Sequence, residues 1–157
     1  MRNLSLVVLA AGLAIGTSAT AAPARYPLEV AVNDQPTAAE TAVVRKILSR
    51  SFGKEWPDFE KNAGRHVRFT VAHADINGDG RSDLLVSLDD PGFGYCGSGG
   101  CAGYAILATA QSYAPKAIEL AYFFAKTTVL PAVHHGMHDL RYDDARKVFQ
   151  WNGKAYK

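Results

Sequence analysis

The chain has 157 residues, with 17 Lys or Arg against 15 Asp or Glu, and a formal net charge of +2. Its length is enough for one domain with a modest core. The basic residues are scattered rather than gathered in a stripe, so the charge pattern argues against a nucleic-acid partner and against an anionic membrane partner.

The segment Met1–Ala21 is predicted to be a secretory signal peptide. Arg2 supplies a positive charge, and Leu4–Ile15 is an apolar run too short to span a bilayer. Ala19–Ala21 has the small-x-small pattern that precedes a cleavage site. Export would leave a single domain over residues 22–157 in the periplasm or the extracellular medium, with no membrane attachment once the signal is removed.

A helix is predicted after an extended segment at Tyr26–Val32. Thr37 stands three residues before Glu40, which is the spacing of a capping box, and Gly53 is a typical residue at which a helix ends. Between these signals the apolar residues fall on one helical face, which predicts a helix over Ala38–Arg50.

Beyond this helix, the pattern changes to strands. Pro57 leaves room for only a short second helical turn around Trp56 and Phe59. From His66 onward, short runs rich in β-formers are separated by Gly, Pro, Asn and Asp. The predicted strands are His66–Ala74, Asp83–Leu88, Ala102–Thr109, Ala117–Phe124, Thr127–Ala132, His138–Tyr142 and Lys147–Trp151.

The most informative stretch is the loop between the first two of these strands, which reads DINGDGRSD. Oxygen-bearing side chains at its first, third, fifth and ninth positions turn to one side, and Gly80 permits the reversal that brings the last one back. Calcium takes about six to eight such oxygen ligands. The loop therefore predicts a Ca²⁺ site formed by the side chains of Asp75, Asn77, Asp79 and Asp83 and the backbone carbonyl of Arg81.

This loop differs from a helix-loop-helix calcium site. Its twelfth position, where a bidentate Glu is expected, is Val86, and both flanks are predicted to be strands. A metal-free hairpin turn is the alternative, because Asn, Asp and Gly favour turns in any case. Three carboxylates in so short a loop favour calcium, because they repel one another when no cation is present.

A second loop contains both cysteines, Cys96 and Cys101. In an exported protein this pair is predicted to form a disulfide that holds one small loop in shape. Two aromatic residues precede it, and rigid loops that carry aromatic rings suit protein interfaces because they lose little entropy on binding. In the alternative, these two rings fold back onto the core. The predicted partner-binding residues are Phe93, Tyr95, Gly97, Ser98 and Gly99.

Three histidines, His134, His135 and His138, lie close to Asp139 in the sequence. Their spacing is not that of the helical H-E-x-x-H zinc motif, which favours ordinary loop histidines over zinc ligands. No residue is assigned a catalytic role. One enzymatic alternative stays open, in which the protein is a small periplasmic hydrolase whose His138 and Asp139 act in a cleft.

The order of the motifs resembles a broad group of exported bacterial proteins. The motifs are DINGDGRSDLLV, YCGSGGCAGYAIL, the G-x-x-D-L element at Gly136–Leu140 and the ending at Trp151–Tyr156. The calcium-type turn between two strands resembles the loops of FG-GAP repeats. Some members of the group resemble periplasmic inhibitors of lysozyme-type muramidases, including immunity proteins, and this resemblance implies a cell-wall hydrolase as the protein partner.

Together these features predict an α+β domain in which an N-terminal helix packs on an antiparallel β-meander, with the calcium-type loop between two strands. The predicted function is that of a calcium-stabilised binding module, an inhibitor or immunity protein rather than an enzyme.

Overall fold

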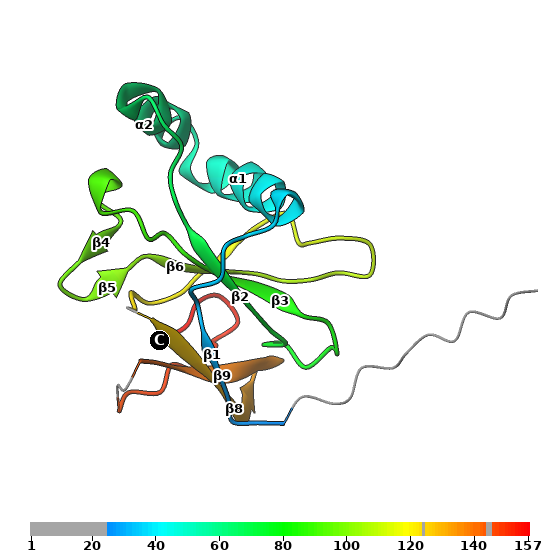
Figure 1. Ribbon diagram of the computed structural model, residues 1–157. Helices are drawn as coiled ribbons and strands as arrows, with labels where there is room; N and C mark the ends of the chain where they lie inside the picture. Colours follow the sequence, from blue (N-terminus) through cyan, green and yellow to red (C-terminus); the bar gives the residue numbers. More distant parts are fainter. Residues whose placement is uncertain (1–24, 124, 144–145) are drawn as a thin grey trace, which may run out of the picture.

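The computed structural model describes residues 25–123, 125–143 and 146–157, so the predicted signal peptide lies outside the described residues. The α+β class is confirmed, with two helices and three antiparallel sheets (Figure 1). The elements are β1 (Leu28–Ala31), α1 (Ala38–Phe52), α2 (Glu55–Ala63), β2 (Thr70–Ala74), β3 (Asp83–Ser87), a 3₁₀ turn η1 (Pro91–Phe93), β4 (Cys96–Gly97), β5 (Gly100–Cys101), β6 (Gly103–Ile106), β7 (Ile118–Glu119), β8 (Lys126–His134) and β9 (Met137–Tyr142).

Helix α1 begins where the capping box places it. The Glu40 amide donates to Thr37 Oγ1 over 3.2 Å, and the Thr37 amide donates to Glu40 Oε2 over 2.7 Å. Helix α2 is longer than the single turn expected from the sequence. Pro57 lies in its first turn, where backbone N–H groups have no partner within the helix, so the missing N–H of proline costs little there.

The strands form three sheets rather than one meander. The largest has the order β2-β3-β6-β7, the second has the order β1-β8-β9, and β4 pairs only with β5. Strand β1 pairs with β8, which follows much later in the chain. A sequence pattern predicts strands but gives no signal for such a distant partner, so the division into sheets was not predictable.

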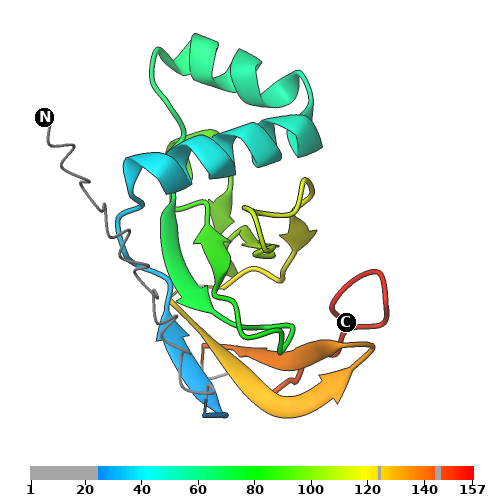
Figure 2. The same cartoon turned by 90° about the vertical axis from the view of Figure 1, so that its right-hand side faces the viewer.

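The molecule has three layers, which Figure 2 shows from the side: the helices, the four-stranded sheet and the three-stranded sheet. Alternate residues of β3 point to opposite faces of the central sheet. Leu84 and Val86 pack toward α1, whereas Leu85 packs toward the three-stranded sheet. The helix-side core includes Val44, Leu48, Trp56, Val71, Leu84, Val86 and Ile106, and the sheet-side core includes Ala72, Ile76, Leu85, Ala105, Phe123, Val129 and Leu140.

Four of the predicted strands are shorter by several residues in the structure. The strands expected over His66–Ala74 and Ala102–Thr109 are reduced to β2 and β6. The strand expected over Ala117–Phe124 is reduced to β7, because Phe123 leaves the β6 edge and pairs with Cys101 instead. The strand expected over Lys147–Trp151 is present only as isolated pairings of its residues Phe149 and Trp151. Among the described residues, the helices are too short or too polar to cross a membrane.

Candidate functional site

The calcium-type loop lies at the junction of the two larger sheets. It connects β2 to β3, and the backbone N–H of His138 in β9 donates to the carbonyl oxygen of Ile76 over 2.8 Å. The Tyr26 hydroxyl donates to the carbonyl oxygen of Asp75 over 2.8 Å. Because Ile76 itself is fully buried in the sheet-side core, the conformation of this loop is coupled to the packing between the sheets.

The exposed half of the loop is held by hydrogen bonds within the loop. The Asp75 carboxylate accepts from the backbone N–H groups of Gly78 and Gly80 over 2.7 and 2.8 Å. Asp79 accepts from the backbone N–H of Arg81 over 2.8 Å and forms an ion pair of 3.0 Å with the Arg81 guanidinium. The Arg81 side chain therefore offsets part of the negative charge that the sequence pattern assigned to a cation.

Asp83 is fully buried at the start of β3. Its two carboxylate oxygens accept backbone N–H groups from Ile76 over 2.9 Å and from Ala108 over 2.7 Å. Burial raises the pKa of Asp83 to about 6, and the negative charges of Asp75 and Asp79 act in the same direction. Negative charge is therefore costly at this position in the absence of a cation.

The donor chemistry of the loop fits calcium, because the candidate ligands are all oxygen atoms and a carboxylate oxygen that accepts one hydrogen bond keeps a second lone pair. The arrangement is not that of a closed coordination shell, since Asp75, Asp79 and Asp83 do not bring three carboxylate oxygens within 4.8 Å of one another. A cation bound by Asp79 would compete with Arg81 for its carboxylate. The calcium site therefore stays a prediction, with Asp75, Asn77, Asp79, Asp83 and the Arg81 carbonyl as its ligands.

The second predicted loop is a disulfide-closed hairpin. The disulfide between Cys96 and Cys101 is confirmed, and the two residues are direct cross-strand partners in β4 and β5. Figure 1 shows this hairpin projecting from the side of the molecule. Its tip, Gly97–Gly99, is exposed, and its base is tied to the domain by hydrogen bonds between the backbones of Cys101 and Phe123.

Phe93 and Tyr95, the two aromatic residues before the hairpin, are half buried. This agrees with the alternative in which their rings fold back onto the core. Tyr95 packs against Phe52 and Trp56, with ring centroids 5.6 and 6.2 Å away, and Phe93 stacks on Tyr95. Each ring keeps some exposure. The freely accessible part of the predicted partner-binding loop is therefore Gly97, Ser98 and Gly99.

The histidine-rich segment contains one close His–Asp pair. His134 Nδ1 lies 2.6 Å from Asp139 Oδ1, and the Asp139 side chain is almost fully buried. His138 Nδ1 instead lies 2.7 Å from the Leu130 carbonyl, and its ring stacks on Tyr26. His135 is at the β8–β9 turn, where it is exposed.

These histidines do not gather at one centre. In the described part of the chain, the one group of three metal-binding side chains with ligand atoms within 4.8 Å is Asp89, Cys96 and Cys101, and its two sulfur atoms form the disulfide. The surface hollows along α1, α2 and residues 65–70 have volumes of about 140 to 500 Å³ and are lined by other residues than His134, His138 and Asp139.

Sequence reasoning missed the residues that support the loops. Asp90 is fully buried, accepts two hydrogen bonds from Arg65 over 2.5 and 2.8 Å, and also accepts the backbone N–H of Arg68. In the sequence, only the position of Asp90 directly before Pro91 indicated that it caps the turn η1. No sequence signal indicated that the aromatic residues Phe59 and Tyr122, near the hairpin, would be exposed.

No protein-family model matches this chain, and the searches of curated proteins and of solved structures return no significant match.

Proposed function

We propose that this protein is an exported binding module that contacts a protein partner through the hairpin Cys96–Cys101. The single observation that supports this function best is the form of the hairpin, which is closed by a disulfide, exposed at its tip and anchored at its base. A loop with these properties presents backbone N–H and carbonyl groups of Gly97, Ser98 and Gly99 to a partner.

The anchoring of the hairpin favours recognition because a loop fixed before binding loses little conformational entropy when a complex forms. Leu88 donates its backbone N–H to Ala102, and Ala102 donates to Tyr95, over 2.9 and 2.8 Å. These bonds join the hairpin to the end of β3. The absence of bulky side chains at the tip would allow a partner surface to approach its backbone closely.

In this proposal calcium has a structural role. The ion would be held by the ligands named above, and when bound it would offset the charge of Asp83 and the neighbouring carboxylates. The chain's own contacts from Tyr26 and His138 fix the same loop from the other sheet. Binding would therefore stabilise the junction between the two larger sheets rather than shape the hairpin directly.

We propose a cell-wall hydrolase as the partner, because the sequence motifs resemble those of exported muramidase inhibitors and immunity proteins. Purified residues 22–157 should reduce the rate at which a lysozyme-type muramidase clears a suspension of peptidoglycan. The reduction should disappear when Ser98 in the hairpin tip is changed to Trp. The test uses a panel of secreted muramidases, with the protein at an equimolar concentration and at about a tenfold excess. Unaltered clearance by every enzyme of the panel would contradict this choice of partner.

A hydrolase is the second candidate, and the close His134–Asp139 pair favours it. A buried carboxylate beside an imidazole is an arrangement that can orient a general base. In this case His134→Ala and Asp139→Asn would each abolish turnover of peptidoglycan fragments, whereas His135→Ala at the neighbouring exposed position would not. Absence of turnover by the wild-type protein would exclude this candidate.

A further inference from the structure

A row of aromatic side chains runs beside the hairpin, on the helix side of the central sheet. We call it the aromatic face, and it consists of Phe59, Phe93, Tyr95, Tyr104 and Tyr122. Its ends are exposed, since Phe59 keeps 43% and Tyr122 keeps 56% of its surface accessible. Large apolar groups that stay exposed around a rigid projecting loop are typical of a contact surface.

Four members of the aromatic face, Phe59, Phe93, Tyr95 and Tyr104, are linked through ring contacts. Phe59 meets Phe93 edge to face with centroids 6.5 Å apart, and Phe93 stacks on Tyr95 at the same separation. Phe52 joins Tyr95 to Tyr104, with centroid distances of 5.6 and 5.8 Å.

The other end of the face lies next to β7. Phe123 points into the sheet-side core, and its chain neighbour Tyr122 is exposed. The chain that leads to Tyr122 runs along β6, because Leu120 donates its backbone N–H to the Gly103 carbonyl over 2.8 Å and an added Cβ at Gly103 would stand 3.1 Å from the Ala121 carbonyl oxygen. Tyr122 therefore extends the row beyond Tyr104, to the edge of the central sheet.

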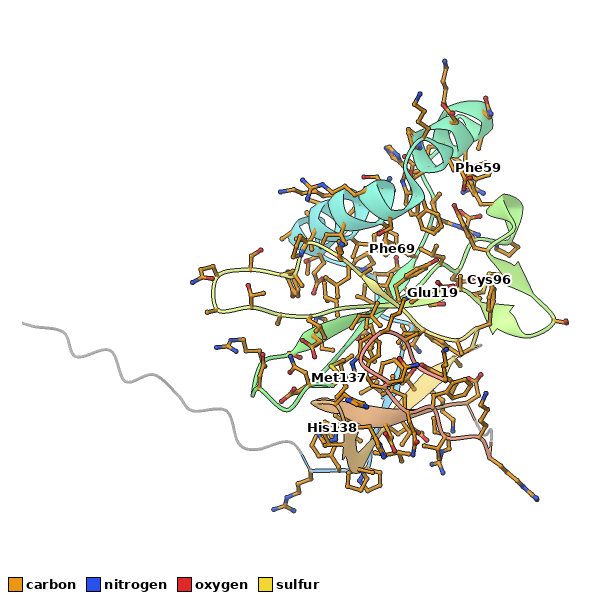
Figure 3. The ribbon with its side chains drawn as sticks, turned by 180° about the vertical axis from the view of Figure 1, so that it is seen from behind. Phe59, Phe69, Cys96, Glu119, Met137 and His138 are labelled. Carbon is orange, nitrogen blue, oxygen red and sulfur yellow. A yellow bond between two sulfur atoms is a disulfide. The ribbon has the colours of Figure 1, made fainter. Side chains whose placement is uncertain are left out.

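Two carboxylates border this face. Glu119 is the direct cross-strand partner of Tyr104, so the two side chains lie on the same side of the sheet. Glu55, in the first turn of α2, directly precedes Trp56, whose ring centroid lies 6.2 Å from that of Tyr95, and its charge adds to burial in raising the pKa of the Tyr95 hydroxyl. Both carboxylates are exposed, and neither forms an ion pair within the described part of the chain. Figure 3 labels Phe59, Cys96 and Glu119, which mark the helix, hairpin and strand around the face.

The molecule already pairs one ring of this face with a cation. The Arg65 guanidinium carbon lies 4.7 Å from the centre of the Phe93 ring, and the same guanidinium is held by Asp90. At this end of the face, Arg65 therefore already supplies the cation that contacts both the Phe93 ring and the Asp90 carboxylate. At the other end, Tyr122 and Glu119 lie three residues apart, and in the described part of the chain no cation lies over the Tyr122 ring or pairs with the Glu119 carboxylate.

We propose that the aromatic face and its two bordering carboxylates, Glu55 and Glu119, bind a protein surface that presents Lys or Arg side chains. This inference rests on the proposed function and names the chemistry of its partner. Carboxylates bind the cations and tyrosine rings lie against them, and both interactions gain from desolvation in a contact. A carbohydrate could also stack on the rings but would make no use of negative charge at the border.

The test is an NMR titration of ¹⁵N-labelled residues 22–157 with three probes: the peptide Ac-Arg-Gly-Arg-NH₂, the peptide Ac-Glu-Gly-Glu-NH₂ and chitotriose. The cationic peptide should cause saturable shifts at the amides of Glu55, Glu119 and Tyr122, and the two other probes should not. The double variant E55Q/E119Q should weaken that binding about threefold or more. Glu29→Gln removes one carboxylate at the distant strand β1 and should leave the binding unchanged.

The outcomes separate the inference from the proposed function. If the cationic peptide causes no saturable shift at these amides, or if chitotriose shifts them equally, the inference is wrong. In another outcome, Ser98→Trp no longer inhibits a muramidase, whereas E55Q/E119Q inhibits it as the wild-type protein does and salt has no effect. This result would overturn the inference and support the proposed inhibitor function. Specific peptide shifts without inhibition of any muramidase would support a cationic contact surface and contradict the proposed hydrolase partner. Circular dichroism of both variants checks that they fold.

Discussion

Gly100 lies against the main chain of Phe123, so closely that an added Cβ would stand 2.4 Å from the Phe123 carbonyl carbon and oxygen. The backbone of Gly100 also has φ +103°, a conformation that side-chain-bearing residues rarely adopt. This contact is where the disulfide hairpin joins the domain, and it explains why a glycine occupies this position of the ring.

Gly100→Ala should therefore destabilise the protein by about 1–3 kcal/mol, because the added methyl group meets backbone that cannot move without shifting the β5 edge. Urea denaturation measures this change. Gly99→Ala is the matched control in the same ring, where an added Cβ has no neighbour within 4 Å, and it should cost less than about 0.5 kcal/mol. Equal stability of the two variants would show that the hairpin is not anchored as described.

A second prediction concerns stability in acid. The guanidinium of Arg65 lowers the pKa of Asp90 to about 2, from an ordinary value of 3.8, and the N–H of Arg68 adds to the effect. Because the folded-state pKa is lowered, the carboxylate stabilises the fold above pH 4, and this contribution is lost as the pH falls toward 2.

The loss should amount to about 2 kcal/mol, at about 1.4 kcal/mol for each pKa unit. Denaturation by urea at several pH values between 2 and 5 measures it. Asp90→Asn has no carboxylate at this position, so its stability should fall less steeply over this interval than that of the wild-type protein. Parallel curves for the two proteins would mean that the buried Asp90 is not the group that titrates.

The calcium prediction is tested by heating. Calcium at about one hundred times its dissociation constant should add about 2.7 kcal/mol to the free energy of unfolding, because it binds the folded loop and not the unfolded chain. The midpoint of thermal unfolding should therefore rise with CaCl₂ and return with a chelator. Asp75→Asn should reduce the shift, whereas Glu29→Gln, which removes a carboxylate that pairs with Lys126 and not with the loop, should preserve it. A midpoint that CaCl₂ in the millimolar range does not move would leave the metal-free turn as the correct interpretation.

Local signals predicted the elements that depend on neighbouring residues. The Thr37–Glu40 capping box and Gly53 placed α1 within two residues of its observed end, and the spacing of Cys96 and Cys101 indicated the disulfide. These predictions succeeded because each rests on hydrogen bonds or covalent chemistry within a few residues.

Contacts between distant segments explain the failures. Pro57 predicts at most a short helical turn, but it lies in the first turn of α2, where its missing N–H costs little and the helix continues to Ala63. The shortening of the Ala117–Phe124 strand depends on Phe123 pairing with Cys101, which no local pattern shows. The partial burial of Phe93 and Tyr95 depends in turn on α2, so the sequence could not decide between an exposed and a folded-back loop.

The candidate site was predictable in its chemistry but not in its geometry. The oxygen-rich residues of Asp75–Asp83 do occupy one turn between two strands. Their spacing gave no sign that Arg81 would pair with Asp79 or that Ala108 would donate to Asp83. Both contacts provide partners within the protein for carboxylates that the pattern alone assigned to a cation.

The most direct test of the proposed function measures how tightly the inhibited muramidase binds two variants. Each variant has a Trp in place of one exposed serine, and the two serines lie in different loops. Ser98→Trp obstructs the hairpin tip, and Ser112→Trp alters a separate exposed loop. Isothermal titration calorimetry should show binding weakened about tenfold or more for Ser98→Trp, a loss of about 1.4 kcal/mol, and unchanged for Ser112→Trp. Equal affinity of Ser98→Trp and the wild-type protein would contradict a partner contact at the hairpin.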